Sequence, residues 1–80
     1  MPNKKINIGV IGSTGSVGKT SLKTIKEYKN KFNVELLICD KNIKEIINQI
    51  KTYNPKYVFL NDKNTYNSTR LKKFKKKVFF

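Results

Sequence analysis

Three glycines spaced three residues apart, Gly12, Gly15 and Gly18, form the strongest chemical signal in this sequence. They stand where an apolar run of strand length passes into a helical pattern. There the first glycine allows a sharp turn, the second lets backbone N–H groups approach a diphosphate, and the third allows close packing of helix and sheet. The amino terminus of the helix adds N–H donors and a partial positive charge. The pattern predicts a dinucleotide-binding loop to which the hydroxyls of Thr14 and Ser16 contribute; a glycine-rich turn without a ligand is the alternative.

A second phosphate-binding motif, the Walker loop of nucleoside triphosphatases, ends in the same way as Gly18-Lys19-Thr20. That loop requires Gly-x4-Gly-Lys-Ser/Thr, because its backbone N–H groups wrap the β-phosphate at a fixed spacing. The residue five positions before Gly18 is Ser13, and Gly12 lies one position too far away. The spacing therefore favours a dinucleotide over a nucleoside triphosphate.

An acidic residue follows the loop at the distance that dinucleotide-binding folds use for the ribose. Such folds place it about 20 residues after the glycines, at the end of the second strand. Asp40 stands there. Its carboxylate favours NAD because it repels the 2′-phosphate of NADP, whereas Lys41 and the helix that starts at Asn42 favour NADP. These residues alone leave the cofactor open, and a role for Asp40 as a plain helix cap is a further alternative.

Four apolar runs indicate the strands that would carry this site. They cover residues 6–11, 32–39 and 56–60, and a fourth opens at 78–80. Helical spacing separates these runs. The order β-α-β-α-β-(α)-β predicts an α/β fold of the Rossmann type, with a partial sheet of parallel strands joined by right-handed crossovers.

The expected helices differ in the clarity of their patterns. The first begins near Val17. In the second, which is the clearest, apolar residues step by three or four between Ile43 and Tyr53, Asn42 is a suitable cap, and Asn54-Pro55 ends the helix. A third, weaker helix is expected from about residue 65 to 74, where lysines crowd the end of the pattern.

The last residues bear on the domain organisation. Val78-Phe79-Phe80 reads as the opening of a strand, and exposed phenylalanines at a sheet edge favour aggregation. We therefore expect residues 1–80 to be the amino-terminal portion of a longer nucleotide-binding domain, or a truncated remnant of one, with the catalytic and carboxyl-terminal domains absent from this chain.

Composition excludes several classes of site within the 80 residues. A single cysteine rules out an internal disulfide framework, and the absence of histidine rules out a histidine-based triad or zinc cluster. No apolar run has the roughly 20 residues that a membrane-spanning helix needs. The formal charge is +13, but 17 of the 18 basic residues are lysines, and Arg70 is the only arginine. Because arginine suits nucleic-acid recognition better, we expect no nucleic-acid partner. Residues 1–5 lack the apolar core of a secretory signal peptide, and together with the missing disulfide framework and membrane span this leads us to expect an intracellular protein without a membrane partner.

The loop sequence also resembles a known family. Residues 12–18, Gly-Ser-Thr-Gly-Ser-Val-Gly, together with the preceding Ile8-Gly9-Val10-Ile11, resemble the opening of the 1-deoxy-D-xylulose 5-phosphate reductoisomerases. The likeness continues through residues 32–37, through Lys41-Asn42-Ile43, and through residues 54–58, the stretch Asn-Pro-Lys-Tyr-Val. It covers about residues 4 to 63.

This resemblance implies an enzyme of non-mevalonate isoprenoid biosynthesis. The family isomerises and reduces 1-deoxy-D-xylulose 5-phosphate to 2-C-methyl-D-erythritol 4-phosphate with NADPH and a divalent metal, magnesium or manganese. It is commonly a homodimer, and the cytoplasm or a plastid would be its compartment. Its metal ligands and substrate site lie in a later domain, so the resemblance implies no catalytic or metal-binding residue in this chain, and turnover is not expected from it alone.

The resemblance also assigns cofactor contacts by position. Thr14, Gly15, Ser16 and Val17 would contact the diphosphate, and Lys41 and Asn42 would hold the adenosine ribose and its 2′-phosphate. Asp40 departs from the family, which commonly has glycine there, and places a carboxylate beside that phosphate.

Two other functions compete with this interpretation. One is a different oxidoreductase with a Gly-x-x-Gly-x-x-Gly loop. The other is a small basic nucleic-acid-binding module, whose binding to duplex DNA would depend on salt and survive changes in the glycine loop.

Overall fold

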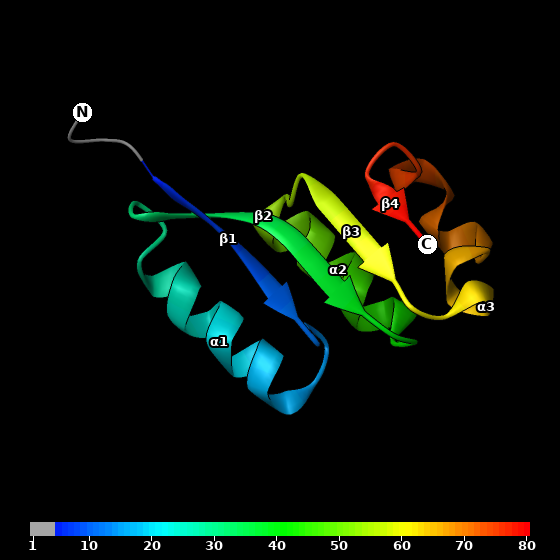
Figure 1. The fold of residues 1–80 in the computed structure, drawn as a ribbon, viewed down its shortest axis with the longest axis horizontal. Helices are drawn as coiled ribbons and strands as arrows, with labels where there is room; N and C mark the ends of the chain where they lie inside the picture. The colour runs from blue at the N-terminus through cyan, green and yellow to red at the C-terminus, as the bar shows by residue number, and fades with distance from the viewer. Residues whose placement is uncertain (1–4) are drawn as a thin grey trace.

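A computed structural model describes residues 5–80 and contains one four-stranded parallel sheet (Figure 1). The strands lie side by side in chain order: β1 (Ile6–Ile11), β2 (Phe32–Cys39), β3 (Tyr57–Leu60) and β4 (Val78–Phe79). Helices connect them, so the predicted Rossmann-like α/β arrangement with a partial parallel sheet is confirmed.

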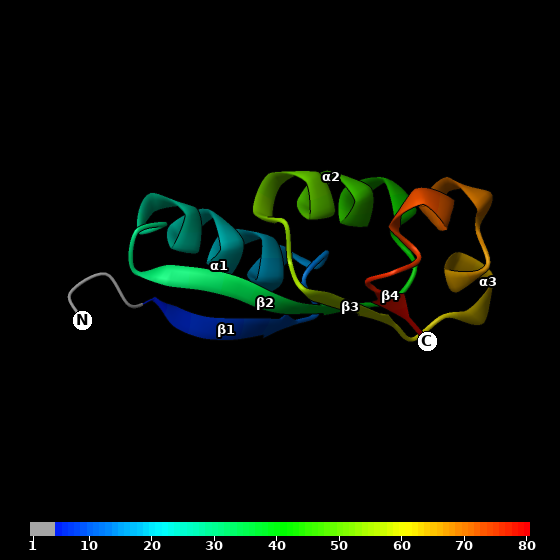
Figure 2. The same ribbon diagram turned by 90° about the horizontal axis from the view of Figure 1, so that it is seen from above.

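The longer helices lie over the same face of the sheet, and the shortest lies beyond the end of β3 (Figure 1 and Figure 2). The helices are α1 (Ser16–Glu27), α2 (Ile43–Tyr53), the one-turn α3 (Lys63–Tyr66) and the 3-10 helix η1 (Thr69–Phe74). Asn42 caps α2 as predicted, by accepting a hydrogen bond from Glu45 N at 3.1 Å. The helix ends at Asn54, which adopts the left-handed conformation with φ 47°.

The expectation of one helix over residues 65–74 is wrong. The chain turns at Asn67 and Ser68 instead, so that α3 and η1 are separate. Ser68 has extended backbone angles, and its hydroxyl accepts a hydrogen bond from Arg70 N at 3.2 Å. A serine that bonds its neighbouring backbone in this way competes with a continuous helix.

The core lies between this layer of helices and the sheet. Buried leucine, isoleucine and valine side chains meet there, with Leu22 and Ile46 from the helices and Leu37, Val58 and Leu60 from the strands. A β-bulge interrupts the β1–β2 register between Ile8 and Gly9.

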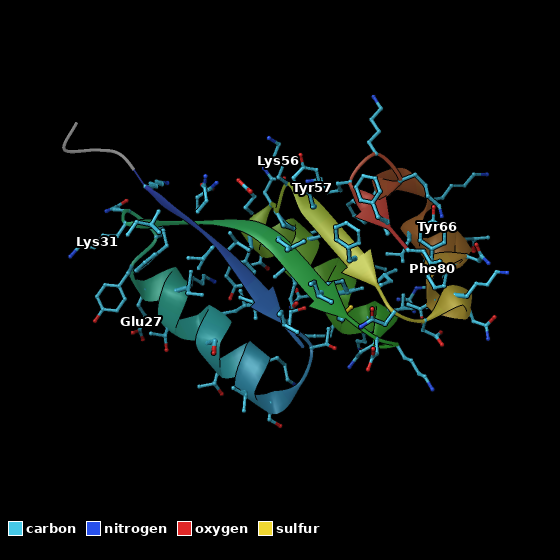
Figure 3. All side chains as sticks on the ribbon, viewed as in Figure 1. Glu27, Lys31, Lys56, Tyr57, Tyr66 and Phe80 are labelled. Carbon is cyan, nitrogen blue, oxygen red and sulfur yellow. The ribbon has the colours of Figure 1, made fainter. Side chains whose placement is uncertain are left out.

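The opposite face of the sheet carries exposed aromatic side chains from β3 and β4. Phe59 and Phe79 stack with ring centroids 5.4 Å apart, and Tyr57 lies 6.1 Å from Phe79. They alternate with the buried Val58 and Val78, which point toward the helices. Near the end of the sheet, Tyr66 contacts Phe80 with a centroid separation of 5.8 Å (Figure 3). Among residues 5–80, no helix has the length and apolar character needed to cross a membrane.

Candidate functional site

The chain turns sharply off β1 at Gly12. This residue has φ 71°, a conformation that residues with a Cβ rarely adopt. Its N–H and the N–H of Ser13 both donate to the carbonyl oxygen of Ile38 near the end of β2, at 2.7 and 3.0 Å. The loop is thus attached to the second strand at its first two residues.

Helix α1 packs directly on this turn through Gly18. A Cβ at Gly18 would overlap the carbonyl oxygen of Gly12 and the Cα of Ser13. The predicted roles of the first and third glycines, in turning and in close packing, are therefore both present in the structure.

The amino terminus of α1 leaves backbone donors free for a ligand. Gly15 is the N-cap and has no side-chain cap, and the first helical hydrogen bond runs from Lys19 N to Gly15 O at 2.9 Å. The N–H groups of residues 16–18 precede that bond and have no carbonyl partner within the helix. This arrangement suits an anion such as a diphosphate.

An open hollow of about 340 Å³ lies beside the loop. It forms where the ends of β1 and β2 meet, and Thr14, Gly15, Asp40 and Asn61 are among the residues that line it. Ligands of parallel α/β folds bind at this carboxyl edge of the sheet. The structure thus brings together three of the predicted site residues, although Asp40 lies 25 residues of sequence beyond Gly15.

The other predicted residues are placed differently. Ser16 and Val17 lie on the outer face of α1, where Val17 is 81 % exposed, and neither residue lines the hollow. Asn42 uses its side-chain oxygen to cap α2. Asn42, and not Asp40, is therefore the cap of this helix, and the exposed Asp40 remains at the hollow.

Burial changes the acidity of one group next to the hollow. The Cys39 thiol is 2 % exposed, and its pKa rises from 9.0 to about 11 because it is buried and, to a smaller extent, because Asp40 is negatively charged. Cys39 is therefore a neutral core side chain at physiological pH. Farther along the same edge, hydrogen bonds from the Thr65 hydroxyl and then from its N–H lower the pKa of the Asp62 carboxyl.

Two residues near the site were missed in the sequence. Asn61 follows β3 directly, and its place at the carboxyl end of a third parallel strand was a usable signal. Gln49 is only 2 % exposed and donates to the carbonyl oxygen of Ser13 at 2.8 Å. The sequence offered a weaker indication of Gln49, namely that a polar residue stands on the same face of the helix as the apolar Ile46 and Ile50.

The described residues do not fit a metal site. Within residues 5–80, no group of three or more histidine, cysteine, aspartate or glutamate side chains is placed to hold an ion.

Comparison with known proteins decides the family. A family model for 1-deoxy-D-xylulose 5-phosphate reductoisomerase matches residues 8–79. The chain belongs to this family. The match extends the likeness beyond residue 63, through η1 and into β4. It supports the reductoisomerase interpretation over both the other oxidoreductases and the basic nucleic-acid-binding module.

Individual reductoisomerases are similar to most of the chain. The enzyme of Pelagibacter ubique is 45 % identical over 74 residues, which is 90 % of this chain and 19 % of that protein. The enzyme of Sulfurihydrogenibium sp. is 46 % identical over 55 residues, 69 % of this chain and 15 % of that protein. The apicoplastic enzyme of Plasmodium falciparum is 38 % identical over 66 residues, 79 % of this chain and 14 % of that protein. The chain thus spans less than a fifth of the length of these relatives.

Proposed function

We propose that residues 12–17 bind the diphosphate of NADPH. The observation that carries this proposal is the shared hollow, which joins Thr14 and Gly15 of the glycine loop to Asp40 at the end of β2. The backbone N–H groups at the start of α1 supply donors and the positive end of the helix dipole. The nicotinamide ring of the bound cofactor would supply the hydride, and the residues of this chain would bind and orient it.

Lys41 and Asn42 hold the adenosine ribose and its 2′-phosphate in this proposal. Both come directly after Asp40, which lines the hollow, and immediately before the first residue of α2. The Lys41 ammonium group and the amino terminus of α2 attract the 2′-phosphate, whereas the Asp40 carboxylate opposes it. Asp40 therefore weakens the preference for NADPH over NADH without removing the diphosphate contacts.

The proposal extends to the whole protein through its family. Residues 1–80 form the amino-terminal portion of the NADPH-binding domain of an enzyme that converts 1-deoxy-D-xylulose 5-phosphate to 2-C-methyl-D-erythritol 4-phosphate. The divalent metal, magnesium or manganese, and the sugar phosphate bind to other parts of that protein, which acts as a homodimer in the cytoplasm or in a plastid. The apicoplastic relative supports the plastid alternative.

Replacing Gly15 by valine tests the diphosphate site. Gly15 has φ −80° and ψ 172°, angles that valine adopts readily, so the fold should persist. The added side chain would project where the diphosphate approaches. We expect calorimetry on the protein expressed from its complete gene to detect no NADPH binding by Gly15→Val. The control, Thr24→Val on the exposed side of α1, should bind like the wild type; equal affinity in both variants would refute the proposal.

A further inference from the structure

A buried glutamine connects the second helix to the glycine loop. Gln49 lies on the buried face of α2, and its Nε2 donates to Ser13 O at 2.8 Å and to Glu45 Oε2 at 3.0 Å. The bond to Ser13 spans 36 residues of sequence. A polar group at this depth is costly unless it is hydrogen-bonded. Both bonds are made by Nε2, whereas the buried Oε1 has no partner among the described residues, so the two Nε2 bonds determine where the amide lies.

The identity of the side chain is constrained because both of its partners are acceptors. A carbonyl oxygen on one side and a carboxylate oxygen on the other can be met only by the NH2 end of the Gln49 amide. A glutamate at this position would place its carboxylate against both oxygens. A methionine would have a similar shape but no donor, and would leave Ser13 O without this bond.

Ser13 is held from two directions. It is fully buried, its N–H donates to Ile38 O of β2 at 3.0 Å, and its carbonyl accepts from Gln49 of α2. The carbonyl of Ser13 and the N–H of Thr14 belong to the same peptide unit. Because a trans peptide is planar, its C=O and N–H point in opposite directions. The bond that draws the Ser13 carbonyl toward α2 therefore turns the Thr14 N–H away from α2, and Thr14 is a residue that lines the hollow.

We propose that Gln49, itself oriented by Glu45, is a positioning residue for the dinucleotide-binding loop. It fixes the Ser13–Thr14 peptide so that the Thr14 N–H is presented to the diphosphate. This inference rests on the proposed function, and it adds a residue from the interior of the second helix to a site that the sequence places in the first β-α unit, at the end of β2 and at the start of that helix.

The substitution Gln49→Met removes the donor at nearly constant volume. In the protein expressed from its complete gene, we expect the dissociation constant of NADPH to rise about 10-fold, since the loss of one buried hydrogen bond has an effect of this order. Adenosine 2′-monophosphate, which has no diphosphate, should bind Gln49→Met and the wild type equally. In the nucleotide-free protein, the Thr14 amide should exchange with deuterium faster in Gln49→Met.

A matched variant separates positioning from a general loss of stability. Ile50→Val alters the next residue, which is 3 % exposed and belongs to the core of the same helix, without touching Ser13. Its urea midpoint should fall while its NADPH affinity stays the same. Glu45→Ala should weaken NADPH binding more than Glu45→Gln, which retains an acceptor for Gln49 Nε2.

The outcomes of these experiments test the positioning role of Gln49 separately from the proposed binding of NADPH. If the wild type binds NADPH, Gly15→Val does not, and Gln49→Met binds as tightly as the wild type, the positioning role is refuted and the proposed function stands. Equal losses of NADPH and adenosine 2′-monophosphate in Gln49→Met would show a structural role only, and would also overturn it. If the wild type binds no dinucleotide, the proposed function falls and the positioning role with it.

Discussion

The Cα of Gly18 faces the carbonyl oxygen of Gly12 so closely that there is no room for a methyl group between them. The obstructing atoms belong to the backbone of the turn, which is itself bonded to β2 through Ile38. Such a contact cannot be relieved by rotating a side chain. The loop and the first turn of α1 therefore behave as one packed unit.

This contact predicts that Gly18 and Gly15 differ in how much an added side chain destabilises the fold. Gly18→Ala should lower the free energy of unfolding by about 1–3 kcal/mol, because overpacking displaces backbone. Gly15→Ala should change it by less than about 1 kcal/mol, since a Cβ there meets only Gly12 O, at 3.4 Å. Urea denaturation of both variants checks this difference, and equal losses would contradict it.

The charge at the end of β2 predicts a change in cofactor preference. Asp40→Gly should improve NADPH binding relative to NADH by about 1 kcal/mol, or roughly five-fold, if the carboxylate lies near the 2′-phosphate. Asp40→Asn removes the charge and keeps the shape, so it should show most of the same shift. Calorimetric titration with both nucleotides provides the measurement; an unchanged ratio in the two variants would place Asp40 away from the phosphate.

The buried Cys39 thiol predicts that the stability of the fold depends on pH in the alkaline range. The pKa of Cys39 is about 11 in the folded protein and 9.0 ordinarily, so the unfolded chain releases this proton first. Ionisation of Cys39 should therefore leave the free energy of unfolding unchanged below pH 9.0. As the pH rises from 9.0 toward 11, the free energy of unfolding should decline by at most about 1.4 kcal/mol per pH unit. Urea midpoints of the wild type and Cys39→Ala across this range report the difference. A thiol that iodoacetamide alkylates quickly in the folded protein near neutral pH would contradict its burial.

The sheet and the second helix could be predicted because their patterns are long and local. The apolar run of β2 extends through an eight-residue strand, and the isoleucines of α2 repeat at helical spacing. Asn42 and Asn54 mark the ends of that helix with side chains suited to those positions. Residues 63–74 had no such repeat. There the decisive interaction was the short-range bond from Arg70 N to Ser68, which periodicity does not reveal.

The glycine loop could be predicted for a similar reason, since its glycines are needed for local features of the backbone, the turn at Gly12 and the close packing at Gly18. Gln49 could not, because its partner Ser13 is 36 residues away and the bond uses a backbone carbonyl, which every residue possesses. Nothing in the type of residue at position 13 indicates that its carbonyl is the acceptor. Contacts of this kind become visible only when the helix has been placed over the sheet.

The order of the strands has a consequence for synthesis on the ribosome. Each strand of the sheet pairs with the one made immediately before it, so no strand needs to wait for a distant segment to emerge. The glycine loop, β2 and Gln49 all precede residue 54, so the contacts that hold the loop can form before β3 has left the exit tunnel, whereas Asn61 of the hollow is made after β3. Domains commonly fold from their amino-terminal side during translation. A nascent chain of this protein can thus assemble the glycine loop and the residues that hold it first, and add the aromatic strands afterwards.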